Sequence, residues 1–148
     1  MRLLTFSHTN NGTPLIGVRT GDQILDIAKA AKIAGLSGMP ESMKALFSAG
    51  PEVMSALRDL NALALGDLTT FKSAWTSKES IHYLPPILDA DKFLCVGKNY
   101  RKHLEELKRT DLIREIPEEP TGFIKLNSCL VGHQAKVVKP NGVVRLDY

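Results

Sequence analysis

The chain has 148 residues, 43% of them hydrophobic, and 19 basic and 16 acidic residues give it a formal net charge of +3. This length allows one domain with a core, or a small domain followed by the start of another, and the composition excludes a disordered chain. No dense basic stripe and no stretch of membrane-spanning length is present, so we expect neither nucleic acid nor a membrane as partner.

The first residues predict a small antiparallel β unit. Residues 2–7 and 14–19 have strand character and are separated by the turn-forming Asn10-Asn11-Gly12. A second turn at Gly21-Asp22 leads into the apolar residues 24–27. One face of this unit is apolar and needs a cover.

Two predicted helices supply that cover. One spans residues 40–49, with Pro40 near its first turn and Gly50 just past its end, and the other spans residues 52–65 and stops near Gly66. In the second helix four apolar residues recur at spacings of three and four and so share one stripe, which favours core packing over an interface with another subunit: Val53, Leu57, Leu60 and Ala64.

A boundary is expected around Leu84-Pro85-Pro86-Ile87 and the following Asp89-Ala90-Asp91, where both periodicities break. The predicted organisation is an α+β fold with one domain at 1–85 and a second from 86 to 148. The second part starts with a strand over 92–97 and a helix. A polar loop over 114–121 follows, and then short strands around 122–126, 135–138 and 142–148.

The helix after residue 97 carries His103 and Glu106. Residues three apart lie on one helix face, so the carboxylate can orient the imidazole and hold it as a general base. A solvated helix also produces such a pair by chance, and charged neighbours crowd the same turns: Arg101, Lys102, Glu105 and Lys108. Spacing alone leaves both interpretations open.

Two cysteines, Cys95 in an apolar run and Cys129 after Ser128, form neither a disulfide framework nor a metal-ligand pair. The N-terminus turns polar too early for a signal-peptide core. We therefore expect a cytoplasmic protein whose two thiols are buried and reduced.

Three segments in one order resemble the fumarylacetoacetate hydrolase (FAH) superfamily. They are Gly97-Lys98-Asn99-Tyr100-Arg101-Lys102-His103-Leu104-Glu105-Glu106, then Phe123-Ile124-Lys125, then Leu146-Asp147-Tyr148. The resemblance implies an N-terminal accessory domain over 1–85 and the start of a β-rich catalytic fold over 86–148. In that family Glu-x-Glu follows the last segment and, with a later aspartate, binds Mg²⁺ or Mn²⁺.

Those metal ligands would come just after Tyr148, so the resemblance implies that this chain is an incomplete part of the enzyme. Asp147 alone cannot complete the oxygen shell that a hard divalent cation requires. We therefore expect no metal on this chain and no activity from its 148 residues alone. The alternative is a naturally short, noncatalytic binding or assembly protein.

For the full-length enzyme the resemblance implies hydrolytic cleavage of a carbon–carbon bond in a 2-oxo acid or β-dicarbonyl substrate through a metal-stabilised enolate. His103, oriented by Glu106, would take a proton from water. The same resemblance allows an isomerase, decarboxylase or lyase. It also implies a homodimer that acts on a small oxo acid.

Lys125 is expected to pair with a substrate carboxylate or an enolate oxygen, with an exposed strand lysine as the alternative. Asn99 and Tyr100 are candidate substrate contacts, although helix capping by Asn99 and half-buried packing of Tyr100 are equally open. Arg101 is a candidate carboxylate contact for which solvent exposure is the simpler expectation. His133 is expected at a loop or pocket rim.

Overall fold

The computed structural model describes residues 1–113, 118–119 and 121–144. The chain divides into two compact units: the first contains Met1–Leu88 and the segment that begins at Val131, and the second is Asp89–Leu130. Antiparallel sheets and a few helices make up the described chain, which confirms the predicted α+β class.

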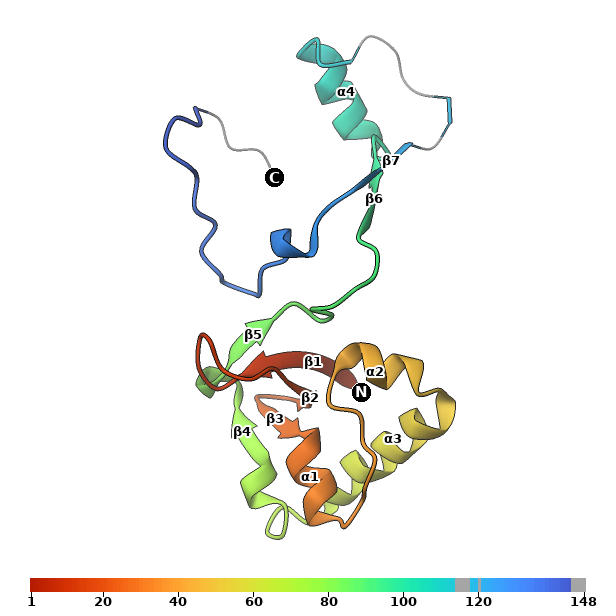
Figure 1. The fold of residues 1–148 in the computed structure, drawn as a ribbon, viewed down its shortest axis with the longest axis vertical. Coiled ribbons are helices and arrows are strands. Elements are labelled where there is room, and N and C mark those ends of the chain that lie inside the picture. The colour runs from red at the N-terminus through yellow and green to blue at the C-terminus, as the bar shows by residue number, and fades with distance from the viewer. Residues whose placement is uncertain (114–117, 120, 145–148) are drawn as a thin grey trace. The chain divides into compact units, whose positions relative to one another are not determined.

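The first unit is built on a five-stranded antiparallel sheet with the strand order β4-β3-β2-β1-β5 (Figure 1). Its strands are β1 (Arg2–Ser7), β2 (Leu15–Thr20), β3 (Gln23–Asp26), β4 (Trp75–Ser77) and β5 (His82–Leu84). The first three confirm the predicted β unit and its two turns. The short β4 and β5 were not predicted, because three residues are too few to establish a period of two.

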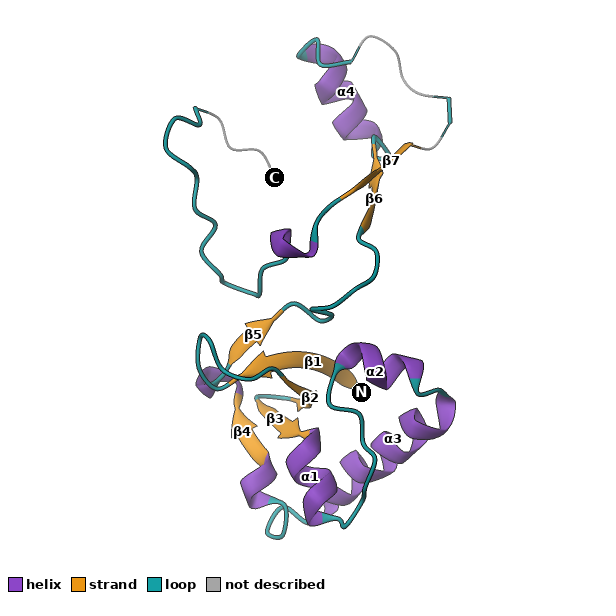
Figure 2. Cartoon of the chain, in the orientation of Figure 1, coloured by secondary structure: helices purple, strands orange, loops and turns teal. Residues whose placement is uncertain are grey.

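Three helices lie beside this sheet in the same unit (Figure 2). They are α1 (Ile27–Ile33), α2 (Met43–Ser48) and α3 (Pro51–Gly66). Their buried side chains share one core with alternate residues of the sheet, among them Ile16, Val18 and Leu25. The opposite sheet face buries a smaller cluster, Leu4, Phe6, Ile24 and Ile81. The predicted helical cover is confirmed.

Local signals explain where the helices begin. The Asp26 carboxylate, 2% exposed, accepts a hydrogen bond from the Lys29 amide at 3.1 Å and caps α1, a helix that was not predicted. Ser42 caps α2 in the same way, so Pro40 lies before that helix and its predicted start was too early. Pro51 is the first residue of α3, a position whose N–H has no partner within the helix, so proline costs no hydrogen bond there.

The predicted stripe on α3 is confirmed as core. Leu57, Leu60 and Ala64 are buried, and Val53 packs against the same cluster. Two short 3₁₀ helices, η1 (Lys72–Ala74) and η2 (Lys78–Ser80), flank β4 and complete this part of the chain.

The second unit contains a two-stranded antiparallel ladder of β6 (Leu94–Gly97) and β7 (Thr121–Ile124), with α4 (Arg101–Arg109) between them in sequence. A 3₁₀ helix, η3 (Asn127–Cys129), follows β7. The described residues of α4 include no buried side chain. This ladder leaves Cys95 half-buried and Cys129 exposed, so the expectation of two buried thiols was wrong, although both are free.

The strand predicted over 135–138 is not formed, and Val137 and Val138 are 67% and 81% exposed. A strand needs a neighbour for its ladder hydrogen bonds, and local β propensity does not supply one. Residues 142–144 form no strand either. The rest of that predicted strand, including Leu146-Asp147-Tyr148, and much of the predicted loop lie outside the described residues.

Within the described chain, no helix has the length and apolar character needed to cross a membrane.

Candidate functional site

The helix that carries the predicted dyad starts from a left-handed turn at the end of β6. Lys98, directly after Gly97, has a φ of 50°. This conformation costs a residue with a Cβ on the order of 1–3 kcal/mol, so it persists only where the surrounding structure enforces it. The N-cap of α4 is Tyr100, with no side-chain hydrogen bond to the helix, which overturns the alternative that Asn99 caps this helix.

His103 and Glu106 lie on one face of α4, in its first two turns. His103 Nδ1 is 3.7 Å from Glu106 Oε2, and the two side chains are 44% and 52% exposed. This separation exceeds a hydrogen bond and allows an ion pair when the imidazole is protonated. Catalytic contacts are often loose before the substrate binds, so the arrangement is compatible with a proton-transfer pair.

The other motif residues on this helix point to solvent. Tyr100 is 74% exposed, which overturns the alternative of half-buried packing. The Arg101 side chain is 94% exposed, and its Nε lies 3.7 Å from Glu105 Oε1. Such an exposed ion pair contributes little to stability. The exposed side chains of Arg101 and Tyr100 are therefore accessible to a ligand.

Lys125 follows β7 directly. Its amide donates to the Phe93 carbonyl at 3.0 Å, which extends the ladder by one hydrogen bond. Its Nζ lies 5.8 Å from the centre of the Phe123 ring, within range of a cation–π contact. Phe123 therefore restrains an otherwise exposed ammonium group beside the ladder that leads into α4.

The described residues include no group of three or more His, Cys, Asp or Glu side chains arranged to hold a metal ion. The donor set for a hard divalent cation is thus not assembled by the described part of this chain.

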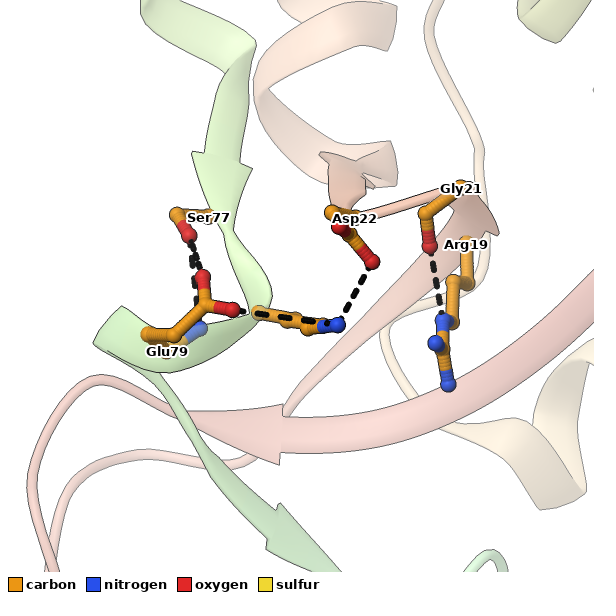
Figure 3. A network of polar contacts seen from close by, with 6 residues as sticks. Arg19, Gly21, Asp22, Ser77 and Glu79 are labelled. Atoms are coloured by element: carbon orange, nitrogen blue, oxygen red, sulfur yellow. Dashed lines mark hydrogen bonds and ion pairs between the residues drawn. The ribbon is translucent and has the colours of Figure 1, made fainter.

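A second polar cluster, in the first unit, was missed by sequence reasoning. Lys78 Nζ lies 2.6 Å from Asp22 Oδ1, Glu79 is hydrogen-bonded to Ser77, and Arg19 Nε donates to the Gly21 carbonyl (Figure 3). A hollow of about 550 Å³ lies beside it, lined by Arg19, Lys78, Glu79, Tyr83, His133 and Gln134. His133 is exposed there, edge-on to Tyr83 with 5.8 Å between the ring centres.

Hydrogen bonds shift the pKa values of three side chains in this cluster. The hydrogen bond and charge of Lys78 lower the pKa of Asp22, and the same contact raises the pKa of Lys78. The hydrogen bond from Ser77 lowers the pKa of Glu79. Asp22 and Lys78 are 56 residues apart, and no sequence motif links them, so no local signal could have predicted the pair.

Comparison with known proteins bears on the segment that contains β6, α4 and β7. Residues 92–148 match the family described as fumarylacetoacetate (FAA) hydrolase C-terminal. This segment belongs to the fumarylacetoacetate hydrolase superfamily. The resemblance drawn from the three sequence segments is thereby confirmed, and enzymes of this family commonly use divalent metal ions.

Two similar proteins carry names that describe an activity. Oxaloacetate tautomerase YisK of Bacillus subtilis is 30% identical over 131 residues, which cover 86% of this chain and 42% of the relative. The mitochondrial oxaloacetate tautomerase FAHD2A of Bos taurus is 25% identical across the whole chain, again over 42% of the relative. An Archaeoglobus fulgidus protein is 32% identical over 83 residues. The chain thus spans about two fifths of the length of these two tautomerases.

Proposed function

We propose that the enzyme containing these residues interconverts the keto and enol forms of a 2-oxo dicarboxylic acid of the oxaloacetate type, with His103 moving the proton. The observation that carries the proposal is the His103–Glu106 contact on α4, at 3.7 Å, in a segment that matches the FAH family. The names of the two tautomerases support the reaction class.

The reaction needs one group that accepts a proton from carbon. His103 takes the proton from the carbon beside the ketone, and the electron pair of that C–H bond forms the C=C bond of an enolate. The enolate oxygen then takes up a proton to give the enol. No carbon–carbon bond breaks and no water is consumed, so the product is an isomer of the substrate.

Glu106 supports this transfer electrostatically. Its carboxylate is nearer to Nδ1 of the imidazole, which leaves Nε2 as the nitrogen that exchanges a proton with the substrate. When His103 holds the proton, the carboxylate at 3.7 Å can form an ion pair with the imidazolium. The pair can thus stabilise the charge that develops during the step.

Lys125 is proposed to bind a carboxylate of the substrate. Its ammonium lies beside the ring of Phe123, because residues two apart along an extended strand project to the same face. A cation held in this way attracts a dianionic substrate and offsets the charge of the enolate. Asn99, Tyr100 and Arg101 are proposed as further polar contacts on the turn and first residues of α4, and a homodimer as the assembly.

The divalent metal that the family implies, Mg²⁺ or Mn²⁺, would polarise the ketone when bound, and the described residues include no group that could hold it. Hydrolytic cleavage of an acylpyruvate-like substrate is the second candidate, since the same enolate chemistry can follow attack of water on a distal carbonyl. Product analysis separates the two reactions. A tautomerase returns a product of unchanged mass, whereas a hydrolase releases two acids.

The full-length enzyme is therefore mixed with oxaloacetate and, separately, with an acylpyruvate, and the products are followed by NMR and mass spectrometry. Accelerated keto–enol exchange of oxaloacetate without fragments supports the proposal. Two fragments from the acylpyruvate, with no acceleration of keto–enol exchange, would assign the hydrolytic reaction instead.

A further inference from the structure

The junction between β6 and α4 is fixed by a side chain from β7. Thr121 Oγ1 donates a hydrogen bond to the Gly97 carbonyl oxygen at 2.9 Å, across 24 residues of sequence. Thr121 and Gly97 are register partners at the end of the β6–β7 ladder. The hydroxyl therefore acts on the last strand residue before the left-handed turn at Lys98.

Close packing at Gly97 supports this contact. A Cβ on Gly97 would lie 3.2 Å from Thr121 Oγ1 and 3.5 Å from Phe123 Cδ1, so a side chain there would press on the hydroxyl. The absence of a side chain lets the two strands approach and keeps the hydrogen bond short.

Little else in the described chain fixes the start of α4. The helix has no buried side chain, and its N-cap residue, Tyr100, makes no side-chain cap. Its first residues therefore take their direction from the turn at Lys98, whose φ of 50° is a conformation that a lysine adopts only when it is held there.

We propose that Thr121 is a positioning residue for His103: its hydroxyl holds the Gly97 carbonyl, and with it the left-handed turn from which α4 projects the imidazole. The same hydrogen bond joins the strand that leads into Lys125 to the strand that leads into His103. The effect of this hydrogen bond on the catalytic rate rests on the proposed function, whereas its effect on the conformation of Lys98 does not.

The test compares Thr121→Val, which keeps the shape and removes the hydroxyl, with Thr121→Ser, which keeps the hydroxyl. Thr110→Val is the matched control, because the Thr110 hydroxyl donates to the Glu106 carbonyl at 2.9 Å at the other end of the same helix. Thermal melting of each full-length variant checks the fold, and Thr121→Ala replaces the valine variant if that variant does not fold.

We expect Thr121→Val to lower kcat by about 10- to 100-fold with KM nearly unchanged, because small displacements of a catalytic group cost about that much. Thr121→Ser and Thr110→Val should stay within about threefold of the wild type on the same scale. A valine variant with unchanged kcat, or a Thr110→Val variant with the same loss, would overturn the proposal.

A second readout does not require activity. Hydrogen exchange at the Lys98 amide and the NMR shifts of the His103 ring should change in Thr121→Val and not in Thr110→Val. If the wild type lacks tautomerase activity, the proposed function fails, and these spectra alone decide the positioning role. Unchanged spectra in Thr121→Val would refute it.

Discussion

His103 and Glu106 approach each other to 3.7 Å on a helix whose described residues bury no side chain. The pair therefore contributes little to the stability of α4, because exposed ion pairs are weak. Because both side chains stay partly exposed and are not needed for folding, they are available to bind a ligand.

Removal of the imidazole should separate catalysis from folding. We expect His103→Ala to lower kcat of the full-length enzyme by about 10²- to 10⁴-fold, the usual contribution of a general base, with an unchanged melting temperature. Steady-state kinetics with oxaloacetate measures the effect. His82→Ala, which removes an exposed imidazole from β5 in the first unit, is the control and should keep full activity. Retention of more than about a tenth of the wild-type rate would rule out His103 as the base.

Lys125 should affect substrate binding more than the chemical step. Loss of a hydrogen bond to a charged group costs about 1.5–3 kcal/mol, so Lys125→Ala should raise KM by roughly 10- to 100-fold. Lys125→Arg should recover part of this loss. Lys92→Ala, at an exposed lysine just before β6, is the control. Equal KM values for Lys125→Ala and the wild type would leave Lys125 as a solvent-exposed lysine.

Much of the fold could be predicted because its signals are local. The alternation in residues 2–7 and the stripe of α3 each report burial through their own period, and both are confirmed. The strand predicted over 135–138 failed, because a strand depends on a partner elsewhere in the chain.

At the candidate site, the motif located α4, and the geometry could not have been derived from it. The placement of the helix depends on the contact between Thr121 and Gly97, which are 24 residues apart in the sequence. The N-cap is Tyr100 rather than Asn99, and it lies two residues after the left-handed Lys98.

The close approach of strands in the first unit makes a prediction about stability. A Cβ at Gly17 would lie 2.8 Å from Ile24 Cγ2 and 2.9 Å from the Leu25 carbonyl oxygen. Gly17→Ala should therefore lower the free energy of unfolding by about 1–3 kcal/mol through overpacking, measured by chemical denaturation. Gly66→Ala is the control, since no atom lies within 4 Å of its Cβ position. Equal effects of the two substitutions would contradict this account of the core.

The Asp22–Lys78 pair predicts a small pH dependence of stability. The folded-state pKa of Asp22 is lowered, so its contribution is present above the unfolded value of about 4 and is lost as the pH falls through the folded pKa. The pKa of Lys78 is raised, so its contribution is present below about 10.4 and is lost as the pH rises through the folded pKa.

Asp22→Asn should accordingly lower the melting temperature at neutral pH, and the difference from the wild type should shrink at both extremes of pH. Asp59→Asn, at an exposed position of α3, is the control. The substitution should also move the pKa of Lys78 back toward its ordinary value, which NMR titration of the lysine side chain measures. An unchanged titration of Lys78 would contradict the assigned pairing.

The proposal as a whole depends on proton transfer at the carbon beside the ketone. Deuterium exchange at that carbon of oxaloacetate, followed by NMR in D₂O and corrected for the spontaneous rate, tests it most directly. We predict that the full-length wild type accelerates exchange without forming fragments and that His103→Ala returns the rate to near background. Exchange that is equally fast in His103→Ala would contradict the central claim that His103 moves the proton.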